Sequence, residues 1–304
     1  MKARLIEDAG RAASDPEQFF RSPAFLAAEG ATHSLAIDET ELRLPVVVRP
    51  IEGTDLRDAI SPYGYPGGSG ASPSPPDPAT IDWSETGLVS IFVRDRIGDD
   101  ACLAGGTVRS RVHVAEGADG IRKRLREQIR RNERRGWGVQ VLPGPEAEPA
   151  DRAAFERAYS ETMARTGAAE RYLYGSGYFE TLLGGERSWL LLAVRDSDRL
   201  AGAIAVASDG YLHYYLGGTA DDAFADSPMK NLFAAMISLG EELGLPVNLG
   251  GGVRAGDSLD EFKRGFATGE APFRTHDLVC DAVAYQKLSA EVEAPEGFFP
   301  AYRA

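Results

Sequence analysis

The chain of 304 residues carries 46 acidic and 33 basic side chains, giving a net charge of −13. This acidic balance argues against a protein that coats nucleic acid non-specifically. The two cysteines and four histidines lack metal-ligand spacing, so we expect neither a disulfide framework nor a metal site. Without an apolar signal segment, or a run of the ~18 apolar residues that a membrane span needs, we expect a cytoplasmic protein.

The first part of the chain predicts peripheral helices followed by strands. We expect helices within residues 1–30 and strands at 33–37, 42–48, 88–93 and 107–114. Residues 62–78 contain six prolines and four glycines and predict a loop. Tyr63 and Tyr65 in this loop fit no core periodicity, so we expect them to line a cleft. The alternative is that both are ordinary loop aromatics that cap the core.

One segment, residues 121–135, is basic within this acidic chain. It holds eight basic and two acidic side chains, and its apolar residues Ile121, Leu125 and Ile129 recur at helical spacing. We therefore expect an amphipathic helix over 119–135 with its apolar stripe packed inward. The basic face is either a solvated surface or a contact for a polyanion. The candidate contacts are Arg130, Arg131, Arg134 and Arg135.

The second part of the chain follows a linker-like stretch, residues 143–149, with three prolines. Helices are expected at 151–166 and 177–183, and three antiparallel strands at 189–194, 200–207 and 211–217. A helix at 228–244, a strand at 246–249, a helix at 258–266 and a strand at 278–285 complete the order. This order predicts an α+β fold, with mixed, mostly antiparallel sheets flanked by helices.

The most distinctive segment begins at the end of the 246–249 strand with three glycines, Gly250 to Gly252. Glycines let backbone approach a ligand closely, and the helix that follows carries Phe262, Lys263 and Phe266. We expect Phe266 to be core and Lys263 to lie beside a ligand. Arg254, in the connecting loop, is suited to bind a carboxylate or phosphate.

Two neighbouring tyrosines, Tyr214 and Tyr215, point to opposite faces of the 211–217 strand. One of them is expected in the core and the other facing substrate, and Tyr215 is our candidate. His213 and Asp277 are expected to be structural.

Two motifs resemble the FemABX-like branch of the GNAT acyltransferase superfamily. One is the loop Ser61-Pro62-Tyr63-Gly64-Tyr65, and the other is Phe262-Lys263-Arg264-Gly265-Phe266. The resemblance implies two tandem GNAT-like domains, 1–145 with the peripheral helices and 146–304. It also implies that Lys263 stabilises a reacting ester and that Phe262 contacts the acceptor end of a tRNA. The long coiled-coil arm of some members has no counterpart here, which puts tRNA recognition through such an arm in doubt.

The function that the resemblance implies is aminoacyl transfer from an aminoacyl-tRNA co-substrate to an amine, with no other cofactor. The acceptor would be small or peptidic, either an antibiotic peptide intermediate or a peptidoglycan precursor. Aminolysis of an ester passes through a tetrahedral anion, which needs a cation or hydrogen-bond donors. Lys263 supplies the cation, and the N–H groups of 250–252 are the expected donors.

Two alternatives remain open. The first is acyl-CoA-dependent N-acylation by a GNAT enzyme. The segment 217–230 lacks the expected pyrophosphate loop, and its three aspartates would repel a pyrophosphate. The second is a non-catalytic, GNAT-derived module that binds RNA or peptide. Such a module predicts that substitution of Lys263 leaves binding and biological activity intact.

Overall fold

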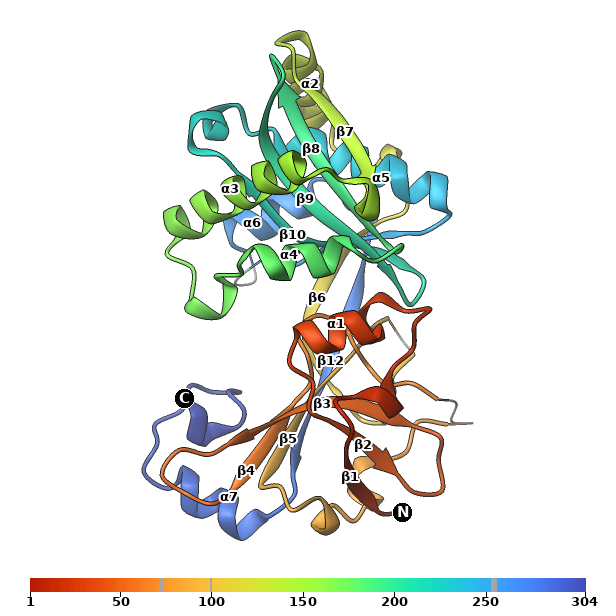
Figure 1. Ribbon diagram of the computed structural model, residues 1–304, viewed down its shortest axis with the longest axis vertical. Helices are drawn as coiled ribbons and strands as arrows, with labels where there is room; N and C mark the ends of the chain where they lie inside the picture. The colour runs from red at the N-terminus through yellow and green to blue at the C-terminus, as the bar shows by residue number, and fades with distance from the viewer. Residues whose placement is uncertain (71–73, 99, 253–255) are drawn as a thin grey trace. The chain divides into compact units, whose positions relative to one another are not determined.

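The computed structural model describes residues 1–70, 74–98, 100–252 and 256–304 (Figure 1). The chain forms two compact units. Unit 1 consists of Met1–Ser110 and Pro272–Ala304, and unit 2 of Arg111–Ala271. The chain passes from unit 1 to unit 2 within strand β6 (Thr107–Ala115) and returns within strand β12 (Gly269–Val279).

Unit 1 is built on a sheet with strand order β1-β2-β3-β4-β5-β12. The pair β4–β5 is parallel and the other neighbours are antiparallel. Alternate residues of β5 are buried, so one face of that strand packs on the core and the other is partly exposed. Its other strands are β1 (Ala3–Glu7), β2 (His33–Ile37), β3 (Arg43–Pro50), β4 (Arg57–Ile60) and β5 (Ser90–Ile97), and its α-helices are α1 (Pro23–Ala28) and α7 (Ala282–Ser289).

Unit 2 has strand order β6-β11-β10-β9-β8-β7, in which β10–β11 is parallel and the other pairs are antiparallel. Its other strands are β7 (Gly138–Pro143), β8 (Ser188–Arg195), β9 (Asp198–Ser208), β10 (Tyr211–Thr219) and β11 (Val247–Gly250). Its helices are α2 (Lys123–Arg134), α3 (Pro149–Thr166), α4 (Ser176–Leu183), α5 (Met229–Leu243) and α6 (Ser258–Arg264).

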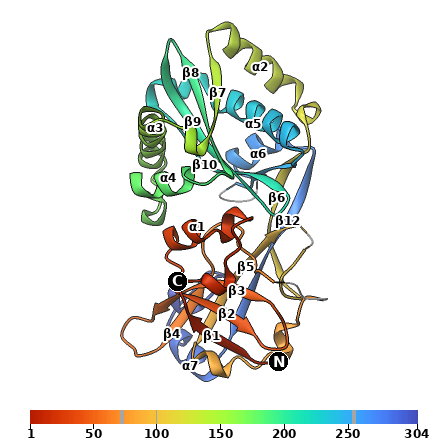
Figure 2. The ribbon, with the colours of Figure 1, turned by 45° about the vertical axis from the view of Figure 1, so that its right-hand side comes forward.

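Helices cover both faces of the unit 2 sheet. Figure 2 shows α3 and α4 on one side of β7–β10 and α5 on the other. Strand β9 is therefore buried along residues 200–208. Helix α3 lies very close to β10, because a Cβ atom on Gly218 would come within 2.5 Å of the Ala158 carbonyl oxygen. The chain thus adopts an α+β fold with two sheet-and-helix units, as predicted.

Several elements differ from the expectation. Residues 3–7 form strand β1 rather than a helix, because they pair with β2 at the edge of the unit 1 sheet. The expected last strand, 278–285, ends at Val279, and α7 begins at Ala282 with Asp281 as its N-cap. The units also differ from the predicted domains 1–145 and 146–304. The 143–149 stretch lies inside unit 2 between β7 and α3, and β12 carries the chain back to β5 of unit 1.

Candidate active site

The candidate site begins where the parallel strands β10 and β11 stop pairing. Their register joins Leu212 to Val247 and His213 to Asn248, and β10 continues to Thr219 beyond that point. On its other side, β10 has an irregular register with β9 between Tyr214 and Leu216. Such a bulge re-aims the side chains around it.

Lys263 of α6 is a buried cation, with only 6% of the residue exposed. Its Nζ donates a hydrogen bond to the Gly251 carbonyl oxygen at 2.8 Å and lies 5.2 Å from the centre of the Tyr214 ring. Burial lowers the pKa of Lys263 to about 8, although the carboxylates of Asp257 and Asp260 act in the opposite direction. Near neutral pH, this side chain is an ammonium that carries three N–H donors.

The aromatic residues around Lys263 have different environments. Phe266 is fully buried, as predicted, and its ring centre lies 5.3 Å from that of Phe262. Phe262 is partly exposed and also packs edge-on against Phe233 of α5, with ring centres 5.2 Å apart. Lys263 and Phe262 therefore belong to one helix that is anchored in the unit 2 core through Phe266.

The glycine segment holds Lys263 through a carbonyl group. Gly250 has a φ of +74°, which favours glycine. Its N–H donates to Asn248 Oδ1 at 2.8 Å, so in this structure that N–H is paired within the strand end. Arg254 lies outside the described residues.

His213 is a structural residue of the buried strand pair. Its Nε2 donates to the Ser208 carbonyl oxygen at 3.1 Å, and its Nδ1 accepts from Asn248 Nδ2 at 2.9 Å. Burial lowers the pKa of His213 to about 4, so the ring is neutral at physiological pH. The imidazole thus fixes the side chain of Asn248, which in turn holds Gly250.

The two neighbouring tyrosines of β10 point toward different helices. Tyr214 packs against Phe233 of α5, with ring centres 4.9 Å apart, and it is the tyrosine beside Lys263. The hydroxyl of Tyr215 lies 2.8 Å from that of Tyr178 on α4. The Tyr178 ring stacks on Tyr174 at 4.0 Å. Sequence reasoning chose Tyr215, and the bulge that places Tyr214 next to Lys263 has no signal in a single sequence.

Tyr63 and Tyr65 belong to unit 1, whereas Lys263 belongs to unit 2. Tyr65 packs edge-on between Phe20 and Phe273, with ring centres 5.6 and 5.2 Å away. Tyr63 is 38% exposed, and the Arg94 guanidinium lies 5.8 Å from its ring centre. Tyr65 thus packs among aromatic side chains of unit 1, and Tyr63 presents part of its ring to solvent.

The basic helix α2 begins at Lys123 rather than at 119, and it packs inward through buried Ile129 and partly buried Leu125, with Ile121 buried just before it. Its four candidate arginines, Arg130, Arg131, Arg134 and Arg135, are all exposed. Arg135 also forms an ion pair with Asp226, with 3.2 Å between Nη1 and Oδ1. Lys230, at the start of α5, has its pKa lowered by burial and by the nearby charges of Arg131 and Arg124. Positive charge therefore gathers where α2 meets α5.

Two of the three aspartates that argued against a pyrophosphate are paired with arginines. Asp226 is paired with both Arg135 and Arg195, and Asp221 with Arg165. The electrostatic argument against CoA is therefore weaker than the sequence suggests. Asp222, the third, is exposed and lines a pocket beside α3.

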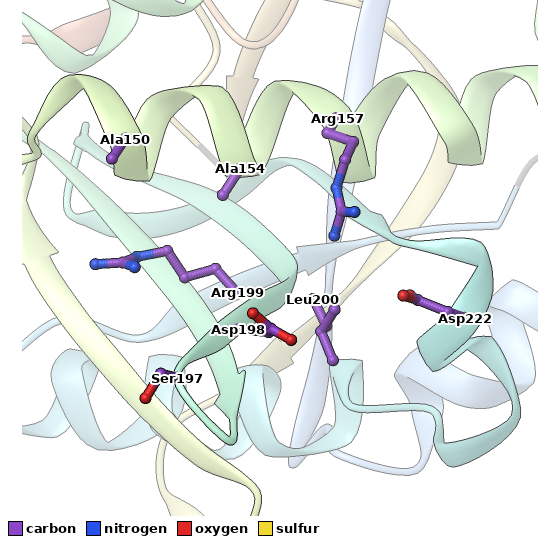
Figure 3. Close-up of a pocket in the computed structure, with 8 residues that line it drawn as sticks. All are labelled: Ala150, Ala154, Arg157, Ser197, Asp198, Arg199, Leu200 and Asp222. Atoms are coloured by element: carbon purple, nitrogen blue, oxygen red, sulfur yellow. The ribbon is translucent and has the colours of Figure 1, made fainter.

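This pocket, drawn in Figure 3, contains none of the predicted site residues. The charges of Arg157 and Arg199 on its walls are offset by those of Asp198 and Asp222. Arg199 also pairs with Asp151 of α3, with 2.5 Å between Nε and Oδ1. The candidate site is therefore centred on Lys263. The pocket is lined by Ala150, Ala154, Arg157, Ser197, Asp198, Arg199, Leu200 and Asp222.

Residues 120–264 match the family model described as an acetyltransferase (GNAT) domain. This range lies inside unit 2 and includes Phe262 and Lys263. No curated protein sequence matches the chain. Among the described residues, no helix is both long and apolar enough to cross a membrane.

Solved structures similar to the chain span nearly its whole length. FemX is 12% identical with a TM-score of 0.63, covering 94% of this chain and 99% of its own. The C-terminal domain of a putative lysylphosphatidylglycerol synthetase from Agrobacterium fabrum is 13% identical, with a TM-score of 0.59 and coverage of 91% and 93%. L-PGS from Bacillus licheniformis is 11% identical, with a TM-score of 0.59 and coverage of 85% and 87%. These likenesses show a Fem-like, two-domain GNAT fold, and the family match over residues 120–264 supports an acyltransferase.

Proposed function

We propose that the chain is a FemABX-like aminoacyltransferase, which transfers the aminoacyl group of a charged tRNA to an amine. The observation that carries the proposal is Lys263, an ammonium buried beside a glycine strand end and held by the Gly251 carbonyl oxygen. Burying a charge costs free energy, so a buried ammonium is more typical of a functional site than of an ordinary helix surface. Its position in the motif shared with FemABX proteins supports a role in acyl transfer.

In the proposed reaction, the acceptor amine attacks the ester carbonyl carbon. A C–N bond forms, the ester C–O bond breaks, and the amine proton ends on the ribose oxygen of the leaving tRNA. Lys263 stabilises the negative charge that develops on the carbonyl oxygen in the tetrahedral intermediate. Because the ester is already activated, the chemistry requires no nucleophilic serine or cysteine. We place the reaction in the cytoplasm, where charged tRNA is found.

The second candidate, acyl-CoA-dependent N-acylation, is favoured by the match to an acetyltransferase domain and by the neutralised Asp221 and Asp226. One experiment separates the two. The protein is incubated with a pool of charged tRNAs or with acetyl-CoA, together with peptidic amines, peptidoglycan precursors and phosphatidylglycerol vesicles. We expect loss of the aminoacyl ester and no loss of acetyl-CoA. Consumption of acetyl-CoA alone would make the chain an N-acetyltransferase.

The pH dependence of transfer provides a test of the lysine's role. Because the ammonium form of Lys263 is required and its pKa is about 8, the rate should fall above about pH 8, by up to about tenfold per pH unit. Deprotonation of the acceptor amine adds a rising limb to the pH–rate profile. The pH of this rising limb should change with the acceptor, whereas the falling limb that belongs to Lys263 should stay at the same pH. A rate that keeps rising to pH 10 with every acceptor would exclude a catalytic ammonium.

The exposed arginines of α2 are proposed to contact the tRNA backbone. Replacing Arg130, Arg131 and Arg134 with glutamine should lower the slope of log Kd for tRNA against log salt by about 1 for each phosphate that the helix no longer neutralises. Arg135 is left unchanged because it pairs with Asp226. As a control, Arg157→Gln removes a half-exposed charge from α3 of the same unit and should leave the slope unchanged. An identical slope for the triple variant would remove α2 from the interface.

A further inference from the structure

His113 lies at a junction between the two segments that hold Lys263. It belongs to β6, where its backbone is in register with Gly250 of β11. Its side chain turns to α6, where Nε2 lies 2.8 Å from Asp260 Oδ1. The residue is only 2% exposed. One buried residue therefore contacts the glycine strand end through its backbone and the lysine helix through its ring.

Asp260 also hydrogen-bonds other groups at and near the start of α6. Its Oδ2 accepts from the N–H of Gly256 at 3.1 Å and from Arg264 Nη2 at 2.6 Å, while its own N–H donates to Asp257 Oδ1. The hydrogen bond from His113 is the largest cause of a lowered pKa at Asp260, so this carboxyl is ionised at neutral pH. Asp260 precedes Lys263 by three residues, which puts both on the same side of the helix.

The position of the lysine nitrogen depends on both segments. Its Nζ hydrogen-bonds Gly251, the residue after Gly250, and a Cβ atom placed on Gly250 would lie 3.0 Å from Nζ. A shift of α6 relative to β11 would therefore either break this hydrogen bond or press the ammonium onto the strand. The His113–Asp260 pair is the side-chain link between β6 and α6 that opposes such a shift.

We propose that His113 is a positioning residue for Lys263, acting through Asp260 to hold α6 in register with the Gly250–Gly251 strand end. The inference rests on the proposed function of Lys263 and adds a residue that the motif does not contain. Packing alone is a poor explanation for an imidazole here. Its Nδ1 is buried without a hydrogen-bond partner among the described residues, and Glu270 Oε1 lies 3.6 Å away. Burying a polar nitrogen in this way costs free energy, which an apolar residue would avoid.

The test uses the full chain and compares His113→Leu with His113→Gln. Glutamine keeps an N–H donor near the position of Nε2, whereas leucine fills a similar volume without one. Steady-state transfer from charged tRNA gives kcat and KM. Titration of the lysine ¹³Cε resonances by NMR, with Lys263→Arg to assign the signal, gives the pKa of Lys263 without any substrate. Thermal unfolding of both variants measures their stability.

For His113→Leu we expect kcat to fall on the order of 10- to 100-fold, with KM for tRNA within about twofold of the wild-type value. The reason is that the Lys263 ammonium is misplaced rather than removed. Release of α6 also admits water, so the pKa of Lys263 should rise from about 8 toward its ordinary value. His113→Gln should restore both values even if its Tm stays lowered.

The proposal is overturned if His113→Leu leaves kcat and the Lys263 pKa unchanged, or if both variants lose activity only in proportion to their loss of Tm. These outcomes are distinct from failure of the proposed function. If the wild-type chain discharges no charged tRNA, aminoacyl transfer is wrong. The lysine titration in the two variants still decides whether His113 positions Lys263.

Discussion

Replacing Lys263 with methionine is expected to lower aminoacyl transfer at least about 100-fold while making the fold more stable. The loss follows from removing the cation that faces the developing oxyanion. Single-turnover transfer with saturating charged tRNA measures it. Leu191→Ala, a core substitution on β8 of the same unit, serves as the matched control. It should lower Tm but keep most of the rate.

The gain in stability follows from the pKa of Lys263. Its folded value of about 8 lies below the ordinary value of 10.5, so folding disfavours the proton. The free-energy cost of burying the charged lysine is fully present below pH 8. It disappears as the pH rises through 10.5, so the free energy of unfolding of the wild type should increase between these two pH values. A shift of this size corresponds to about 3 kcal/mol. Loss of the hydrogen bond to Gly251 offsets part of it, which leaves a net gain of about 1–2 kcal/mol.

Urea unfolding of wild type and Lys263→Met at pH 7 and at pH 10 measures this gain. The difference between the two proteins should shrink at the higher pH, because the folded lysine is then neutral and most of the cost of burying its charge has disappeared. A variant that is less stable than wild type at pH 7, and equally active, would show that Lys263 is an ordinary structural lysine.

The largest expected loss of stability comes from Asp58 on β4, whose side chain is fully buried. Its carboxylate accepts from Arg49 Nε at 3.0 Å, from Arg303 Nε at 2.7 Å and from the Tyr302 hydroxyl at 3.2 Å. Asp58→Ala should lower the free energy of unfolding of unit 1 by about 3 kcal/mol, because it leaves two partly buried guanidinium groups without their shared partner.

The matched control for Asp58 is Asp38→Ala, which removes an exposed ion pair with Arg4, 3.3 Å long. Such surface pairs contribute about 0–1 kcal/mol. Hydrogen exchange should show that Asp58→Ala loosens the segment around Tyr302 and Arg303 and leaves the amides of unit 2 protected. Equal effects of the two substitutions on unfolding would contradict the role given to Asp58.

Local patterns in the sequence predicted much of unit 2. The three antiparallel strands β8 to β10, helix α5 and the start of the short helix α6 at Ser258 follow from local periodicity. Lys263 was chosen because glycines and aromatics surround it in the sequence. In the structure this lysine is buried and donates a hydrogen bond to the Gly251 carbonyl oxygen, and its role in transfer stays a prediction.

Contacts between residues far apart in the sequence could not be predicted from local patterns. The pairing of β12 with β5 joins residues about 180 positions apart and makes unit 1 discontinuous, against a boundary expected at residue 145. His113 and Asp260 are likewise 147 positions apart, and neither lies in a pattern that marks a partner. Asp226 looked like a repulsive charge because its partner, Arg135, lies 91 positions away.

The central claim is that this chain uses the Lys263 ammonium to transfer an aminoacyl group from tRNA to an amine. The most direct measurement is single-turnover discharge of a charged tRNA pool by wild type and by Lys263→Met, with the amide product detected by mass spectrometry. We predict that wild type discharges the tRNA and adds one aminoacyl residue to an acceptor amine, and that Lys263→Met does neither. Equal discharge and product by both proteins, or discharge by neither, would contradict it.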